Sequence, residues 1–209
     1  MALGINYESN GGGDFLPIAK YDARAGKVFR VDRVNGENNQ IDISRNFRAV
    51  FDLEHLETGW IDFTSGAPQC ALSVLGSGPK PEKPGDTYME GVRFIAKLGK
   101  DCGGDVREFM STAKAFMRGL DKLHDEYKAA ASANAGKLPV VELEDTVAIT
   151  SGEGARKSTN YAPKFKIVSW VARPEDLVHK GRSLSAPSTT PPSTGSTKVA
   201  APGDEDDFG

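Results

Sequence analysis

The stretch Lys164-Phe165-Lys166-Ile167-Val168-Ser169-Trp170-Val171-Ala172 alternates between apolar side chains and cationic or polar ones, and it ends before Arg173-Pro174. Neighbouring side chains on a strand point to opposite faces, so this period of two predicts a β-strand with one face in the core. The core face would carry Phe165, Ile167 and Val171. The other face would carry Lys164, Lys166, Val168 and Trp170, which places an indole ring beside two cations.

The same period predicts several short strands on the N-terminal side of this stretch. Ala25-Gly26 reads as a turn between two antiparallel strands within residues 15–34. Further strands are expected at Phe47–Leu53, Trp60–Phe63, Ala71–Leu75, Tyr88–Leu98 and Leu138–Thr150. Polar or proline-rich loops are expected at residues 35–39, 76–86 and 151–160.

The segment after Gly103-Gly104 follows a different period. Asp105 is in a position to cap a helix, and from Val106 to Tyr127 apolar residues recur at steps of three and four. The pattern predicts one long helix with a single apolar stripe. Short strands around one helix, with no strand–helix–strand alternation, favour a mainly β domain built as a small barrel or a sandwich.

The composition divides the chain into three parts: a flexible N-terminus at residues 1–14, a domain at 15–180 and a disordered tail at 181–209. The tail begins with a run of Ser, Thr and Pro that has too little apolar surface to fold. Residues 198–209 hold one lysine and four acids, so the whole net charge of −3 lies there. A solubilising terminus would explain the acids but gives no reason for an aromatic after them. The predicted partner-binding residues are Asp204, Glu205, Asp206, Asp207 and Phe208.

No apolar run is long enough to span a bilayer and no leader is recognisable, so a cytoplasmic protein without a membrane partner is expected. Cys70 and Cys102 are far apart and lack a Cys-x-x-Cys spacing. They are expected to be free thiols, not a disulfide or a zinc site.

Motifs for enzymatic chemistry are weak. His55, His124 and His179 are scattered along the sequence, so neither a metal site nor a cofactor is predicted. Residues 152–159 resemble a phosphate-binding loop superficially, but Arg156 stands where that loop needs glycine before its lysine. Asp52, Glu54 and Asp62 could pair as acids, although solvated charges on a sheet explain them better. The chain is therefore expected not to be an enzyme.

A binding function fits better, because single-stranded nucleic acid stacks its bases on aromatic rings while Lys and Arg follow the phosphates. Besides the cationic face of the last strand, the preceding loop supplies Arg156, Lys157 and Tyr161. A second group, Arg24, Lys27, Arg30 and Arg33, could line the same groove. Ordinary packing is the alternative for each aromatic residue taken singly.

In these features the chain resembles bacteriophage single-stranded DNA-binding proteins with an OB-type barrel and an acidic C-terminal tail. The residues that carry the resemblance are Gly59-Trp60, Tyr161–Pro174 and Asp204–Phe208. Gly209 departs from tails that end on the aromatic residue. The long helix corresponds to an insertion that caps the barrel.

The resemblance implies coating of single strands, without sequence preference, during phage DNA replication, recombination or repair in the host cytoplasm. It implies a tail that recruits a polymerase or helicase and competes with DNA for the basic groove. A homodimer is a further possibility. The candidate DNA-binding residues are Lys27, Arg30, Arg48, Trp60, Arg93, Arg156, Lys157, Tyr161, Lys164, Lys166 and Trp170. The alternative is a phage interaction or assembly protein that binds no nucleic acid.

Overall fold

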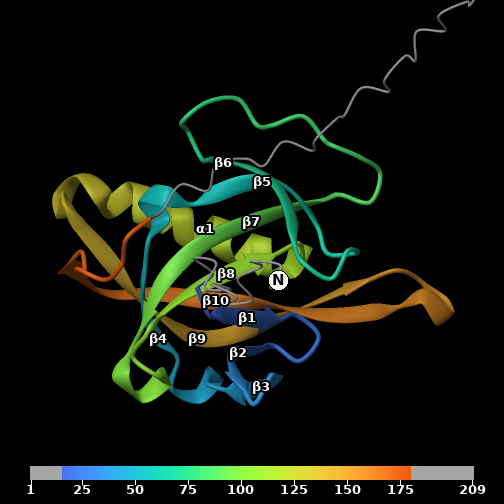
Figure 1. Cartoon of the computed structure of the whole chain (residues 1–209), viewed down its shortest axis with the longest axis horizontal. Coiled ribbons are helices and arrows are strands. Elements are labelled where there is room, and N and C mark those ends of the chain that lie inside the picture. Colours follow the sequence, from blue (N-terminus) through green and yellow to red (C-terminus); the bar gives the residue numbers. More distant parts are fainter. Residues whose placement is uncertain (1–15, 180–209) are drawn as a thin grey trace, which may run out of the picture.

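The computed structural model describes residues 16–179, and within them a mainly β architecture with one long helix (Figure 1). The predicted N-terminal segment 1–14, nearly all of the predicted tail and its acidic end lie outside the described residues. The strands are β1 (Ile18–Asp22), β2 (Lys27–Val34), β3 (Glu37–Asp42), β4 (Arg48–Phe51), β5 (Glu57–Asp62), β6 (Gln69–Val74), β7 (Met89–Leu98), β8 (Val106–Ser111), β9 (Lys137–Ser151) and β10 (Ser158–Ala172). The helix is α1 (Lys114–Ala131), and single 3₁₀ turns occur at Ser44–Asn46, Leu53–His55, Lys100–Cys102, Ser132–Asn134 and Gly154–Arg156.

The strands form one sheet in the order β10-β9-β4-β7-β8-β1-β2-β3, and β5 pairs with both β7 and β6. All pairs are antiparallel except β1 with β8. The sheet curls until β10 approaches β1, where the Tyr161 amide donates to the Ala23 carbonyl at 2.6 Å. Within residues 16–179, no pairing between strands closes the sheet into a barrel. The prediction of a mainly β domain with one long helix is therefore confirmed, whereas a closed barrel is not seen.

Phenylalanine rings fill the space between the curled sheet and α1. Phe94 and Phe109 stack at 5.1 Å between ring centroids, and Phe165 meets Phe116 of α1 edge-on at 6.2 Å. The buried face of the helix also includes Leu120 and Leu123, each 1% exposed. Burying side chains of this size contributes about 2 kcal/mol each, which holds α1 against the sheet.

Gly119 allows α1 to approach β10 at backbone distance. A Cβ atom at this position would lie 2.3 Å from the Pro163 carbonyl oxygen. Any larger residue would therefore push the helix away from the strand.

The prediction of a helix starting at Val106 was wrong. Residues 106–111 form β8, and α1 begins only at Lys114. Arg107 and Phe109 alternate with the less buried Val106, Glu108 and Met110, which is the period of a strand, and pairing with β7 satisfies the backbone. Asp105 does not cap a helix, because its carboxylate accepts a hydrogen bond from Arg107 Nε at 3.0 Å.

Two predicted loops are shorter than expected. Residues 37–39 belong to β3, and the β2–β3 hairpin turns at Asn35 and Gly36, which have φ values of 52° and 84°. An Asn-Gly pair between strands is the usual signal for such a turn. Likewise β10 begins at Ser158, within the predicted loop 151–160.

The remaining predicted strands and one predicted loop are confirmed. The turn at Ala25-Gly26, the loop at 76–86 and the remaining strands lie where the sequence places them. Neither Cys70 nor Cys102 forms a disulfide within the described residues, and the buried Cys102 thiol donates to the Asn46 carbonyl. Within the described residues, no helix combines the length and the apolar character needed to cross a bilayer.

Candidate nucleic-acid interface

A β-bulge changes the predicted face of Trp170. The pairing of β10 with β9 shifts between Ile167 and Ser169, so the alternation reverses beyond that point. Trp170 is thereby turned toward α1, where its indole stacks on Tyr127 with 5.7 Å between centroids and 24° between ring planes. The prediction that Trp170 shares a face with Lys164 and Lys166 was wrong, because period two does not continue through a bulge.

The cations of the same face are paired with acids. A second shift in the ladder, between Lys164 and Phe165, sets Glu144 of β9 between two lysines. Its carboxylate lies 2.7 Å from Lys164 Nζ and 3.7 Å from Lys166 Nζ. The hydrogen bond from Lys164 and its charge lower the pKa of Glu144, and the same contact raises the pKa of Lys164. Arg48 is similarly close to Glu142, at 3.7 Å. This face therefore has little net charge to offer phosphates.

Arg93 was wrongly predicted to be available to DNA. It is 7% exposed, and its guanidinium donates to both oxygens of Glu57 at 2.5 and 2.8 Å. Burial alone would lower the pKa of Arg93, but the Glu57 carboxylate outweighs burial and raises it. This is an internal ion pair that joins β5 to β7.

The remaining predicted residues lie apart. Lys27 binds Asp42 at 2.6 Å and Arg30 binds Asp32 at 3.2 Å, both on the β2–β3 side of the sheet. Tyr161 is half-buried, and its main-chain carbonyl accepts a hydrogen bond from the Tyr21 hydroxyl at 3.1 Å. Arg156 and Lys157 are exposed at the tip of the long β9–β10 hairpin, which extends beyond the rest of the sheet in Figure 1.

Trp60 is the predicted residue with the most distinctive surroundings. The proline-rich loop 76–86 covers its half-buried indole, whose Nε1–H donates to the Pro81 carbonyl at 2.9 Å. Two ammonium groups of the same loop lie over the ring, Lys80 Nζ at 4.4 Å and Lys83 Nζ at 5.6 Å from the centroid. An aromatic face approached by two cations has the composition of a site for a base and its phosphates.

A groove of about 490 Å³ lies on the same side of the sheet, between α1 and strands β5 and β7. Trp60 is directly opposite Glu90 of β7, and Glu90 lines this groove, so the indole and the groove share one face. The apolar lining comes from Leu56, Leu75, Met89, Val92, Met117 and Leu120, and the charged lining comes from Lys114, Arg118, Glu90 and Asp121. Both of these cations are exposed, and no carboxylate of residues 16–179 forms a salt bridge with them. We call this combination of Trp60, Lys80, Lys83 and the groove the Trp60 face.

Sequence reasoning found Trp60 but missed the four lysine and arginine residues around it. The signal for Lys80 and Lys83 was their interleaving with prolines, which holds a loop extended over a neighbouring strand. The signal for Lys114 and Arg118 was their spacing of four on the helix, which places both on one face.

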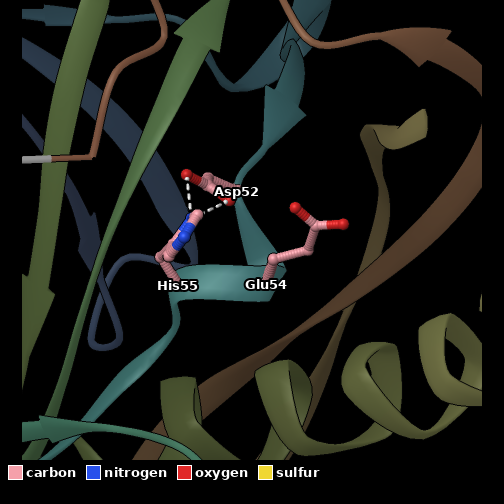
Figure 2. A group of neighbouring side chains, drawn as sticks. All are labelled: Asp52, Glu54 and His55. Carbon is pink, nitrogen blue, oxygen red and sulfur yellow. Dashed lines mark hydrogen bonds and ion pairs between the residues drawn. The ribbon is translucent and has the colours of Figure 1, made fainter. Parts of the chain in front are cut away.

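A cluster of acids and histidines lies on another part of the molecule. Asp52, Glu54 and His55 offer ligand atoms within 4.8 Å of one another, and Figure 2 shows the His55 ring directed at the Asp52 carboxylate. The guanidinium of Arg173 occupies the position a metal ion would take, at 2.7 Å from Asp52 and 2.8 Å from Glu54. Burial would raise the pKa of Asp52, but hydrogen bonds from Arg173 and His55 outweigh burial and lower it. The donor set is therefore already satisfied by an internal cation.

Two of the three histidines, which are far apart in the sequence, lie next to each other in this cluster. His55 and His179 stack with 4.5 Å between centroids and 7° between planes. Burial lowers the pKa of His179, and the neighbouring His55 lowers it further. With Leu177 fully buried and Arg173 bound to Asp52, the cluster fastens residues 173–179 to the domain.

The comparisons with known proteins found nothing similar to this chain. No family model matches it, and neither the curated proteins nor the solved structures contain a match.

Proposed function

We propose that this protein binds single-stranded DNA without sequence preference, acts in phage DNA replication, recombination or repair in the host cytoplasm, and is not an enzyme. The observation that carries the proposal is the Trp60 indole with two lysine ammonium groups over its ring, next to an apolar groove whose cations form no salt bridge within residues 16–179. Bases stack on rings whatever their identity, and cations follow the backbone, so such a surface is tolerant of sequence.

The Trp60 face replaces the β10 face as the proposed centre of binding. On β10 the nearby acids Glu142 and Glu144 compete with phosphates for the same cations. On the Trp60 face Lys80 forms a salt bridge with Glu90, whereas no carboxylate of residues 16–179 forms one with Lys83, Lys114 or Arg118. Arg156 and Lys157 at the hairpin tip are an additional contact for a strand that leaves this face.

A fluorescence titration with an oligo-dT strand tests the function. Stacking of a base on Trp60 quenches its emission, and the midpoint gives the affinity. The same titration with duplex DNA should give weaker binding. If neither strand changes the emission or the anisotropy of a labelled oligonucleotide, the interaction or assembly protein becomes the better proposal.

Unpaired and paired cations should differ in their effect on DNA binding. Log affinity falls linearly with log salt, by about 0.7 for each phosphate neutralised on a single strand. We expect Arg118→Gln and Lys83→Gln each to weaken binding several-fold and to reduce this slope by about 0.7. Lys164→Gln is the matched control, because Glu144 already neutralises Lys164, and its slope should stay near that of the unmodified protein. Equal slopes for all three variants would contradict the assignment of the Trp60 face.

The acidic end of the tail is proposed to compete with DNA for this face and to recruit a polymerase or helicase once displaced. Its carboxylates would pair with Lys114 and Arg118, while Phe208 would enter the apolar groove. Deletion of residues 182–209 should therefore tighten binding to oligo-dT. Restoring the tail with Asp204, Glu205, Asp206 and Asp207 changed to Asn provides the control and should behave like the deletion. Unchanged or weaker affinity after deletion would refute the competition.

A further inference from the structure

Strand β6 has an open edge within the described part of the chain. It pairs with β5 on one side, and no strand of residues 16–179 pairs with its other side. The path of the sheet also ends at β3 and at β10, so the described residues have two further open edges, and β3 lies at the opposite end of the molecule in Figure 1. An unpaired strand presents backbone N–H and C=O groups that can join another strand.

The three edges differ in how they are protected, and β10 carries a proline and two lysines, Pro163, Lys164 and Lys166. β3 begins with Glu37 and ends with Asp42, so two copies paired antiparallel through β3 would bring acids together at both ends. β6 has the sequence Gln-Cys-Ala-Leu-Ser-Val, without any charged residue or proline. Natural sheets usually protect an exposed edge with such residues, and their absence from β6 indicates an edge that is used.

We infer that β6 pairs antiparallel with β6 of a second copy of this chain. When two identical strands pair antiparallel, a two-fold axis perpendicular to the sheet relates them. One residue must then lie directly opposite its own copy at this axis. Ala71 or Leu72 can lie at that position, and in either register only uncharged side chains face one another along the strand. Phe63 and Leu75, which are 48% and 44% exposed just beyond the ends of β5 and β6, add apolar surface beside the pair.

The size of the contact predicts a weak, reversible dimer. Six paired residues with two flanking apolar side chains bury less than a standard interface of roughly 1,600 Å². The dimer should therefore dissociate on dilution in the micromolar range instead of being permanent.

The symmetry also places both copies of Trp60 on one surface. Trp60 is opposite Ala71 of β6, and a two-fold axis perpendicular to the sheet leaves each face on its own side. Three strand spacings then separate β5 of one copy from β5 of the other, about 14 Å. If the proposed DNA binding is correct, one strand can cross both Trp60 faces, and the partner copy contributes a stacking ring to the site.

The oligomeric state of the full-length protein tests the inference. Light scattering coupled to gel filtration should give a mass that rises toward twice that of the monomer as concentration increases. Ser73→Lys places two ammonium groups close to the axis and should hold the protein as a monomer, and Gln69→Lys should act in the same direction. Gln40→Lys adds the same charge to the β3 edge and should leave the dimer intact. Melting temperatures of the variants show whether each remains folded.

Hydrogen exchange locates the contact. Amides of β6 should become more protected as concentration rises, and this gain should be absent in Ser73→Lys. A mass that stays monomeric at all concentrations, a dimer that survives both β6 variants, or β6 amides protected equally at every concentration would each overturn the inference. None of these readouts uses DNA, so a failed dimer and a failed binding function are distinguishable.

Discussion

Replacing Arg173 with Ala should lower the free energy of unfolding by about 3 kcal/mol, one of the two largest effects expected of a single substitution here. The Asp52 side chain is fully buried, and Arg173 supplies two of its hydrogen bonds, at 2.7 and 2.9 Å. Without the guanidinium, Asp52 keeps only His55 as a partner for a charge that water cannot reach. The expected cost is at the lower end for a broken buried pair because Arg173 itself is partly exposed.

The pair formed by Lys97 and Asp176 is the matched control, since it fastens the same C-terminal segment from a more exposed position. Lys97→Ala should cost about 0–1 kcal/mol, as surface ion pairs do. Urea unfolding of both variants measures the difference. A cost for Arg173→Ala no larger than that for Lys97→Ala would show that Asp52 is not stabilised as described. Asp52→Asn removes the buried charge, so combining it with Arg173→Ala should cost less than the two changes added together.

Replacing Trp60 with Ala should weaken binding to oligo-dT by roughly 5- to 150-fold, the range expected when a stacked base loses its aromatic partner. The change should leave most of the salt dependence intact, because Lys83, Lys114 and Arg118 remain. Anisotropy of a labelled oligonucleotide measures the affinity independently of tryptophan emission.

Trp170→Phe is the control for this experiment, because the ring of Trp170 is turned toward Tyr127 and α1. It should retain affinity, and it should also retain the quenching that DNA causes through Trp60. If Trp170→Phe abolishes the quenching while Trp60→Ala keeps it, the β10 strand is the binding surface and the Trp60 face is not.

Much of the fold could be predicted from local sequence pattern. Alternation along Phe47–Leu53 and Tyr88–Leu98 corresponds to strands whose inward residues, such as Phe51 and Phe94, are buried in the core. The predicted secondary structure was wrong where the spacing of apolar residues fitted both a strand and a helix. Val106–Ser111 contains apolar residues that fit steps of three and four as well as two, and pairing with β7 decided for a strand.

The site was harder to predict because pairing between distant residues is invisible in sequence. Glu144 neutralises Lys164 and Lys166 from the neighbouring strand, and Glu57 holds Arg93 inside the protein. The bulge near Ser169 changes which side of the sheet the following side chains occupy, and no glycine or proline in the sequence there predicts it. Conversely Trp60 was found by its sequence context, but the lysines that give its ring a possible function come from a loop about twenty residues away.

The contact between Gly119 and Pro163 limits how the groove can adapt to a ligand. Because Gly119 packs directly on the backbone of Pro163, a shift of α1 along or away from β10 would break this close packing, so the helical wall is expected to stay in place. The opposite wall is formed by residues of β5 and β7, among them Thr58, Glu90 and Val92, and the proline-rich loop over Trp60 is not part of the groove lining. Adjustment of the groove to chains of different thickness is therefore expected from flexible side chains of its lining, such as Met89 and Met117, and not from movement of the helix.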